Sequence, residues 1–269
     1  MDKQLYEYKD IAENYDSFLK VMLEDEFYDG YYDGYQEFYL RLAEKYGDKG
    51  IIDIACGTGA VLLNLAEKGF DIDGTDLSEA MVDIATKKAK EKGLKLNIFA
   101  ADMAQLKSNR QYSLAIIARG GFMNLLTPQL QRQALLSIKD NLLPNGILTF
   151  STFCPNVIYQ YEEMNRAEDD FKFKLEYINA QGYKEKIYNT ITYNQETQVT
   201  TEIWKIDTID KNGDVINTRT RNFSLRQTYK TEMEYLIELC GFEIVDVYGD
   251  YYETPATNNT LIWVLKKRS

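Results

Sequence analysis

Two glycines and a later aspartate have the spacing of a nucleotide-binding loop. Gly57 and Gly59 follow a short apolar run at residues 51–55, and an apolar pattern at helical spacing continues from them to Gly69. Asp76 ends the next apolar segment, about 20 residues after the first glycine. Glycine lets backbone approach a ligand closely, and an acid at this distance can accept hydrogen bonds from ribose hydroxyls. The stretch therefore predicts a strand-helix-strand unit that binds an adenosine-like ligand.

Residues beside these glycines argue against two other phosphate-binding loops. The dinucleotide fingerprint requires a third glycine three positions after Gly59, and Leu62 stands there. A P-loop requires a Lys-Ser or Lys-Thr pair after the glycines, and none follows them. We therefore disfavour NAD and FAD as ligands and exclude a P-loop.

Four motifs resemble those of one enzyme family. Asp53-Ile-Ala-Cys-Gly-Thr-Gly59 resembles the first motif of class I S-adenosylmethionine-dependent methyltransferases, and Asp76-Leu77-Ser78 with Met81 resembles the second. Further matches occur at Ala101-Asp102-Met103 and at Leu143-Pro144-Asn145-Gly146. The resemblance covers residues 1–153 and, less closely, residues 229–269. The overall layout resembles small-molecule members that methylate amino sugars and glycine-type amines.

The resemblance implies S-adenosylmethionine as cofactor and gives roles to the polar residues. Asp53 and the backbone of residues 55–59 would hold the methionine portion, and Asp76 would bind the ribose hydroxyls. Arg119 would meet the cofactor carboxylate, or its backbone would line the methyl site. No side chain is assigned as a catalytic base.

Further residues follow from the same resemblance. Leu77 and Met103 would lie on either side of the adenine, and Asp102 would bind its exocyclic amine. The segment from Tyr8 to Asp16 resembles a lead-in whose tyrosine closes over the methionine end, a role we give to Tyr15; a tyrosine in the core is the alternative. The predicted cofactor-binding set is Tyr15, Asp53, Ala55, Gly57, Gly59, Asp76, Leu77, Met81, Asp102, Met103 and Arg119.

Alternating strands and helices must position these residues. Apolar runs predict strands at about 50–55, 70–75, 95–100, 112–118 and 146–153, with helices between them. Ser78 is expected to cap a helix ending near Lys92, and Pro128 lies just inside the start of another that ends near Leu142. This alternation predicts an α/β fold with a doubly wound, mostly parallel, Rossmann-like sheet, and the resemblance implies seven strands. Ligands of such sheets bind at the carboxyl ends of the strands.

The pattern changes to antiparallel strands after this region. Four β-rich runs, 171–178, 185–193, 198–207 and 215–227, are separated by turn signals, of which Asn212-Gly213 is the strongest. We expect residues 154–228 to form an inserted antiparallel sheet that acts as a substrate lid over a core of residues 1–153 and 229–269. A dimerisation element or a purely stabilising insertion is the alternative. A helix from Tyr229 to Gly241 and strands at 242–248 and 259–266 would complete the core.

Aromatic and basic residues of the insertion are candidates for substrate binding. Arg226-Gln-Thr-Tyr229 resembles a short element near the substrate pocket of small-molecule members, so Arg226 and Tyr229 are our substrate candidates. An aromatic box for an ammonium or a sugar is one interpretation of the aromatic residues, and packing within the sheet is the commoner one. These residues are Tyr177, Tyr183, Tyr188, Tyr193 and Trp204.

Composition limits the partners. The formal net charge of −11 disfavours nucleic acid, because phosphate binding needs a basic surface. The three cysteines, Cys56, Cys154 and Cys240, show no metal-ligand or disulfide spacing. No long apolar run and no leader pattern is present, so we expect a soluble cytoplasmic protein, with a homodimer left open.

The absence of histidine bears on the reaction. The chain has no histidine, which removes the usual general base. Methyl transfer from a sulfonium depends mainly on positioning, and an amine acceptor needs no dedicated base, so we favour nitrogen over oxygen. The alternatives are a small-molecule O-methyltransferase and a cofactor-binding regulatory or interaction protein without turnover. Methylation of RNA or DNA is disfavoured by charge and by the lack of an Asn-Pro-Pro-Tyr-like motif.

Overall fold

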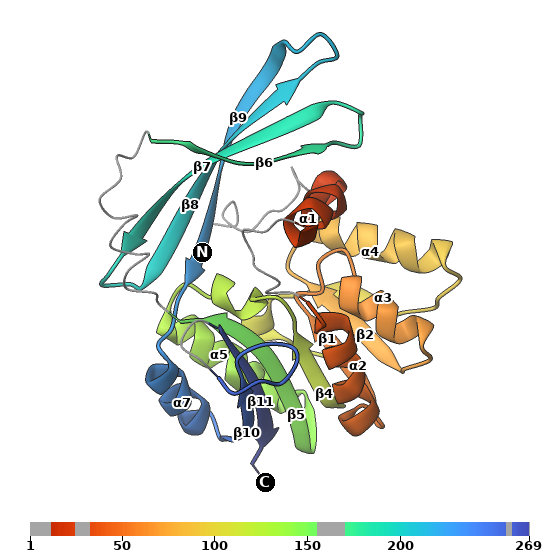
Figure 1. Ribbon diagram of the computed structural model, residues 1–269. Helices are drawn as coiled ribbons and strands as arrows, with labels where there is room; N and C mark the ends of the chain where they lie inside the picture. The colour runs from red at the N-terminus through yellow and green to blue at the C-terminus, as the bar shows by residue number, and fades with distance from the viewer. Residues whose placement is uncertain (1–11, 25–32, 155–169, 257–259, 269) are drawn as a thin grey trace.

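A seven-stranded sheet forms the centre of the core (Figure 1). The computed structural model describes residues 12–24, 33–154, 170–256 and 260–268. The sheet order is β10-β11-β5-β4-β1-β2-β3, in which neighbouring strands from β5 to β3 pair in parallel. Strand β11 pairs antiparallel with both of its neighbours, β5 and β10. Its strands are β1 (Ile51–Ile54), β2 (Ile72–Asp76), β3 (Ile98–Ala100), β4 (Tyr112–Ile117), β5 (Leu142–Phe153), β10 (Phe242–Tyr248) and β11 (Thr260–Lys267). The predicted Rossmann-like α/β fold is confirmed.

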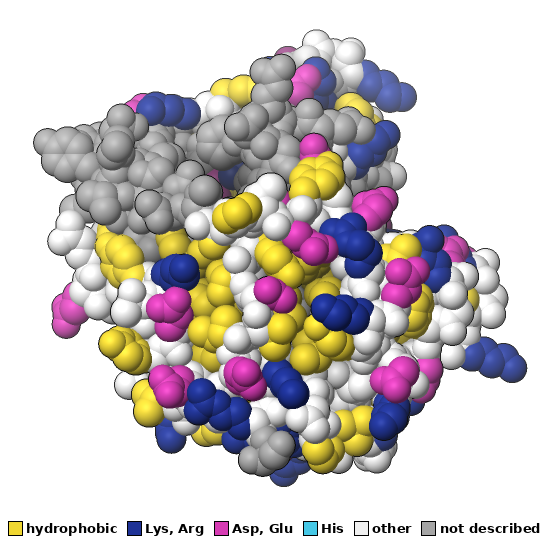
Figure 2. Space-filling model, turned by 60° about the horizontal axis from the view of Figure 1, so that its bottom comes forward, with side chains coloured by type: hydrophobic (Ala, Val, Ile, Leu, Met, Phe, Trp, Pro, Cys, Tyr) yellow, Lys and Arg dark blue, Asp and Glu magenta, His cyan; other side chains and the backbone are white. Residues whose placement is uncertain are grey.

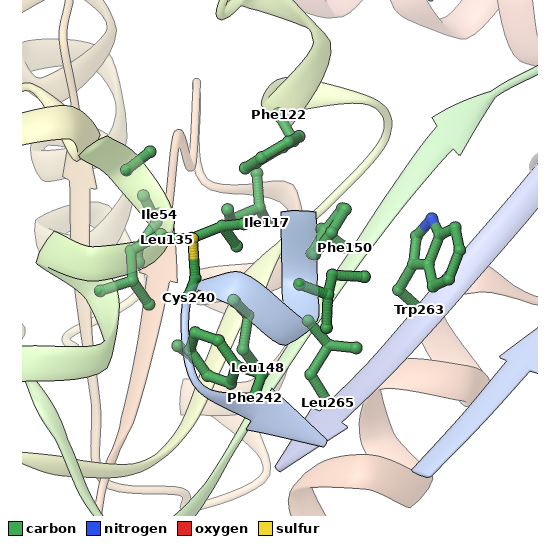
Figure 3. Close-up of a cluster of buried hydrophobic side chains, with 14 of the residues drawn as sticks. Ile54, Ile117, Phe122, Leu135, Leu148, Phe150, Cys240, Phe242, Trp263 and Leu265 are labelled. Carbon is green, nitrogen blue, oxygen red and sulfur yellow. The ribbon is translucent and has the colours of Figure 1, made fainter. Parts of the chain in front are cut away.

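Helices cover both faces of this sheet, and each face has its own apolar cluster. One cluster joins the sheet to α2 (Tyr35–Tyr46) and α3 (Ala60–Glu67). The other joins it to α5 (Pro128–Asp140) and α7 (Lys230–Leu239). In Figure 3, Phe150 of β5 lies beside Ile117 of β4, with Phe242 near the end of α7. Burial on both faces explains why β1 and β4 are almost wholly apolar.

Two helices begin where the sequence predicts, at the Ser78 cap and at Pro128. Ser78 Oγ accepts the Met81 N–H at 3.4 Å and begins α4 (Glu79–Glu91). Thr127 Oγ1 accepts the Leu130 N–H at 3.2 Å and begins α5. The fifth strand departs from prediction, because it begins at Leu142 and includes the Leu143–Gly146 motif. Asn145 there adopts a left-handed φ of 61°, so the backbone bends within the first residues of the strand.

A second, four-stranded antiparallel sheet lies apart from the core and is called the small sheet. Its strands are β6 (Lys172–Ile178), β7 (Lys184–Asn194), β8 (Val199–Ile209) and β9 (Val215–Arg226), in that order. Gly213 has a φ of 91° in the predicted Asn212-Gly213 turn between β8 and β9. The four antiparallel strands are thus confirmed, while residues 155–169 of the predicted insertion lie outside the described residues.

A short N-terminal helix lies between the small sheet and the core (Figure 1). Turn η3 (Ala12–Asn14) leads into α1 (Tyr15–Glu24), which packs on the small sheet. Residues 8–11 of the predicted lead-in lie outside the described residues.

The surface seen in Figure 2 has mixed charge, because acidic and basic side chains are interspersed among hydrophobic ones. Within the described ranges, none of the helices combines the length and the apolar character needed to span a bilayer.

Candidate functional site

The connection from β1 to α3 forms a loop with open space beside it. Ala55, Gly57 and Gly59 adopt left-handed φ values of 55°, 56° and 90°. A Cβ added at Gly57 would meet nothing within 4 Å, whereas one at Gly59 would lie 3.1 Å from Leu63 Cγ. Gly59 therefore serves packing at the start of α3, and Gly57 leaves room for a ligand to approach the backbone.

Asp76 at the end of β2 is tied to this loop. Its Oδ2 accepts the Gly57 N–H at 2.8 Å, and its Oδ1 accepts the Ser78 N–H at 2.9 Å. Burial raises the pKa of Asp76, and these backbone N–H groups oppose the rise by stabilising the carboxylate. Each oxygen is thus oriented by one backbone donor and can accept a further hydrogen bond from a hydroxyl.

Asp53, in β1, carries an unpaired oxygen. The residue is 1% exposed, and its Oδ2 accepts the Leu62 N–H at 3.0 Å. Its Oδ1 is buried and has no hydrogen-bond partner among the described residues. Burial raises the pKa of Asp53 to about 7, while the Leu62 N–H and the charge of Arg119 act to lower it. A buried acceptor of this kind is suited to a cationic ligand group.

Two adjoining cavities lie at the carboxyl ends of β1, β2 and β4. The polar cavity has a volume of about 110 Å³ and is lined by Tyr15, Asp53, Ala55, Cys56, Gly57, Ala60, Val61, Asp76, Met81, Ala118, Arg119, Gly121 and Asn124. The apolar cavity has a volume of about 90 Å³ and is lined by Ile54, Ala55, Asp76, Leu77, Ala101, Asp102, Met103, Gly121, Asn124, Leu125 and Leu130. Asp76 borders both, so one ligand with a charged end, a ribose and a flat apolar ring would span them.

The structure brings the predicted cofactor residues together around these cavities. Tyr15, Asp53, Ala55, Gly57, Met81 and Arg119 line the polar cavity, and the residues predicted for the adenine line the apolar one. Gly59 is the exception, because it lies outside both linings and packs against Leu63. Asp102 also caps η5 (Met103–Gln105), because its Oδ1 accepts the Ala104 N–H at 2.8 Å. Arg119, at a left-handed φ of 49°, places its guanidinium carbon 5.8 Å from the centre of the Tyr35 ring.

Sequence reasoning missed Gly121 and Asn124, which line both cavities. They belong to η6 (Gly121–Asn124), which follows β4 at the same edge of the sheet. The Gly120-Gly121 pair directly after an apolar strand was an available signal. Asn124 offered none, because its position depends on the turn of η6.

Arg226 and Tyr229 lie outside the lining of these two cavities. Arg226 is 4% exposed, and its Nη1 donates to Gln131 at 2.7 Å. Its Nη2 donates to Gln198 at 2.5 Å and to Glu232 at 2.6 Å. The guanidinium thus joins the end of β9 to α5, to the β7–β8 connection and to α7. Tyr229 precedes α7 and is 45% exposed.

Two of the small-sheet aromatic residues are packing residues. Tyr177 and Trp204 are buried in an apolar cluster with Phe18 of α1. The centroids of the Phe18 and Trp204 rings are 4.9 Å apart. For these two, the packing interpretation holds over the aromatic box.

Comparison with known protein families agrees with this geometry. Residues 51–146 match the family model described as a methyltransferase domain. This part of the chain is therefore a methyltransferase domain. The match contains β1, β2, β3 and β4, and therefore the strand ends that carry Asp53 and Asp76. The family resemblance found in the sequence is confirmed.

Two curated relatives align with this chain over about half of their own length or less. A protein of Geobacillus sp. that is named as a methyltransferase is 32% identical over 129 residues, which are 46% of this chain and 52% of that protein. The ubiquinone biosynthesis O-methyltransferase of Rickettsia canadensis is 31% identical over 102 residues, which are 38% of this chain and 42% of that enzyme. The chain thus spans about half the length of these relatives or less.

Solved structures extend the likeness in fold to nearly the whole chain. An S-adenosylmethionine-dependent methyltransferase from Clostridium acetobutylicum has a TM-score of 0.76 and 16% identity, over 95% of this chain and 100% of that one. The sugar N-methyltransferase KedS8 from Streptoalloteichus sp. has a TM-score of 0.72 and 16% identity, over 95% of this chain and 93% of that one. At this identity the likeness concerns the fold, including the small sheet beside the methyltransferase domain.

Proposed function

We propose that this chain is a methyltransferase that transfers a methyl group from S-adenosylmethionine to the nitrogen of a small-molecule amine. The observation that carries the proposal is the pair of adjoining cavities, which are polar beside Asp53 and apolar beside Met103, with Asp76 between them. This order matches the charged end, the ribose and the adenine of the cofactor.

The residues present fit this cofactor. Asp53 Oδ1, buried and without a partner among the described residues, would accept from the ammonium group. Arg119 lines the same cavity and offers a cation for the carboxylate. Asp76 would accept from the ribose hydroxyls, and Leu77 and Met103 would enclose the adenine.

The residues of this chain act by position in the transfer. S-adenosylmethionine, when bound, supplies a methyl group on a positively charged sulfur that leaves as a neutral thioether. Holding the acceptor and the methyl carbon at attack distance supplies about 7 to 11 kcal/mol of the barrier reduction. Tyr15, Asn124 and the Gly57 loop shape the polar cavity and restrict the paths open to the acceptor.

Nitrogen is favoured as the acceptor atom because the chain lacks the side chain most often used as a general base. The chain has no histidine, and an oxygen acceptor generally needs a positioned base. An amine can lose its proton to water. The likeness in fold to a sugar N-methyltransferase supports this choice, and the O-methyltransferase relative keeps oxygen as the second candidate.

The small sheet is proposed as a substrate lid over the core, and Arg226 as a residue that supports it. Tyr229, exposed just before α7, remains the candidate for substrate contact. Arg226 acts through its buried hydrogen bonds, which fix where β9 meets α5 and α7. We assign no nucleic-acid partner because the formal net charge is −11. Retention of the protein on heparin at moderate salt would contradict that assignment.

A labelled-methyl assay tests the proposal. Purified protein is incubated with methyl-labelled S-adenosylmethionine and a panel of amino sugars, glycine-type amines and phenols, and products are identified by mass spectrometry. The proposal predicts label on nitrogen. Label on oxygen would establish the second candidate, and cofactor binding without product over the whole panel would favour a regulatory protein.

A further inference from the structure

The start of α1 contacts three parts of the molecule in turn. Asn14 Oδ1 accepts the Ala180 N–H at 2.8 Å, in the turn between β6 and β7 of the small sheet. Tyr15 lines the polar cavity. Asp16 binds the glycine loop, and Phe18 is buried in the apolar cluster of the small sheet. Within a few residues, the chain touches the small sheet, the cofactor cavity and the core.

Asp16, Thr58 and Lys88 each contact the other two, which joins α1 to the core. Its Oδ1 accepts the Thr58 hydroxyl at 2.7 Å, and its Oδ2 forms an ion pair with Lys88 of α4. Lys88 Nζ also donates to the Thr58 carbonyl oxygen at 3.2 Å. Thr58 is 1% exposed and lies between the two glycines of the loop. Asp16 therefore links the start of α1 to the glycine loop and to α4.

The attachment of α1 to the small sheet is of a different kind. The Phe18 ring lies 4.9 Å from that of Trp204 and 6.2 Å from that of Tyr177, and Phe18 is buried. Packing of aromatic rings in an apolar cluster is strong, whereas the Asp16 and Lys88 side chains are 52% and 29% exposed. Ion pairs at such exposure contribute little to stability. Helix α1 is therefore held more firmly by the small sheet than by the core.

We propose that Asp16 is a positioning residue that couples the small sheet to the cofactor cavity. The proposal rests on the proposed function, because the polar cavity is taken to hold S-adenosylmethionine. When the small sheet moves away from the core, α1 moves with it, Asp16 leaves Thr58 and Lys88, and Tyr15 leaves the polar cavity. Conversely, a ligand that contacts Tyr15 and the glycine loop favours the arrangement in which the small sheet lies against the core. Thermodynamic linkage makes these two effects equal in size.

The test uses S-adenosylhomocysteine as the probe and the full chain as the protein. Calorimetry is expected to give Asp16→Ala a dissociation constant raised by about 5- to 10-fold. Asp16→Asn keeps an acceptor for the Thr58 hydroxyl and loses the charge opposite Lys88, so an intermediate value is expected. Lys92→Met is the matched control, because it breaks the 2.6 Å ion pair between Lys92, at the end of α4, and Glu67, at the end of α3. Its affinity should equal that of the wild type.

Hydrogen exchange separates coupling from a purely structural role. In the wild type, S-adenosylhomocysteine should slow amide exchange in the glycine loop and also in β6 and β7, which lie outside the lining of both cavities. In Asp16→Ala at a saturating concentration of the probe, the loop should stay protected while β6 and β7 exchange as in the ligand-free protein. Asp16→Asn provides the same comparison with a smaller change to the fold.

The outcomes distinguish this proposal from the one on which it rests. Failure of the wild type to bind S-adenosylhomocysteine would contradict the proposed function, and the coupling with it. Binding by the wild type, with equal affinity and equal protection of β6 and β7 in both Asp16 variants, would overturn the coupling alone. Loss of that protection in the Asp16 variants, but not in Lys92→Met, is the result we expect.

Discussion

Leu62 donates its backbone N–H to Asp53 Oδ2 at 3.0 Å, so the Asp53 carboxylate accepts a hydrogen bond from the first turn of α3. Leu62 stands where a dinucleotide-binding loop requires glycine. Its side chain fills the space over β2, because a Cβ added at Gly74 would lie 2.5 Å from Leu62 Cδ2. The Leu62 N–H, at a helix start where a pyrophosphate could otherwise bind, therefore already donates its hydrogen bond to Asp53. This relationship gives the physical reason why the loop suits a nucleoside with a cationic tail.

Replacing Asp76 should weaken cofactor binding. Asp76→Asn removes the charge that strengthens hydrogen bonds to ribose, a loss of about 1.5 to 3 kcal/mol. We expect the dissociation constant for S-adenosylmethionine, measured by calorimetry, to rise about 10- to 100-fold. Asp83→Asn, an equal change of charge at an exposed position of α4, is the control. A change within twofold for Asp76→Asn would show that the ribose assignment is wrong.

Cofactor affinity should depend on pH through Asp53. Because burial raises the pKa of Asp53 to about 7, the residue is largely protonated below that pH when no ligand is bound. An ammonium group favours the ionised carboxylate, so binding expels a proton. Affinity for S-adenosylhomocysteine should then fall as pH decreases from 7 to 5, by up to about tenfold per unit. In Asp53→Asn this dependence should disappear; a dependence that persists would place its origin in another group.

The same carboxyl should reduce the stability of the ligand-free protein at higher pH. Its folded-state pKa lies above its unfolded value, so the folded state binds the proton more tightly and this contribution to stability is lost as pH rises from about 4 to 7. Asp53→Asn should therefore raise the melting temperature at pH 8, by roughly 2 to 4 °C per kcal/mol regained, and change it little at pH 4. Calorimetric scans at both pH values measure this. A variant less stable than the wild type at pH 8 would contradict the account of Asp53.

Gly57 should matter for the ligand more than for the fold. Gly57→Ala introduces a methyl group at a left-handed position, at a cost of about 1 to 2 kcal/mol, and the group would project into the space beside the loop. Gly182→Ala is a matched control, since Gly182 also has a left-handed φ, 82°, and open space around it, in the β6–β7 turn. Both variants should lose similar stability, and Gly57→Ala alone should lose affinity for S-adenosylmethionine. Equal affinities would mean that the ligand does not approach Gly57.

Local patterns were sufficient for the core of the site. The apolar period, Ser78 as a cap and the glycine spacing depend on neighbouring residues, and they placed Asp53, Asp76 and Asp102 at successive strand ends. The small sheet followed for the same reason, because the β-rich runs and the Asn212-Gly213 turn are local signals.

Contacts between distant segments were beyond sequence reasoning. The Asp16 contacts with Thr58 and Lys88 join residues on three elements, and no periodicity indicates them. The burial of Arg226 among Gln131, Gln198 and Glu232 likewise arises only when β9, α5 and α7 meet. A charged residue near the end of a strand therefore resembles a ligand-binding residue until its partners are known.

A crystal structure of the protein with S-adenosylhomocysteine tests the central claim most directly. We predict that the nucleoside spans both cavities, with its ribose hydroxyls on Asp76, its ammonium group on Asp53 Oδ1 and its adenine between Leu77 and Met103. A nucleoside bound elsewhere, or crystals that leave both cavities empty at saturating ligand, would contradict the account.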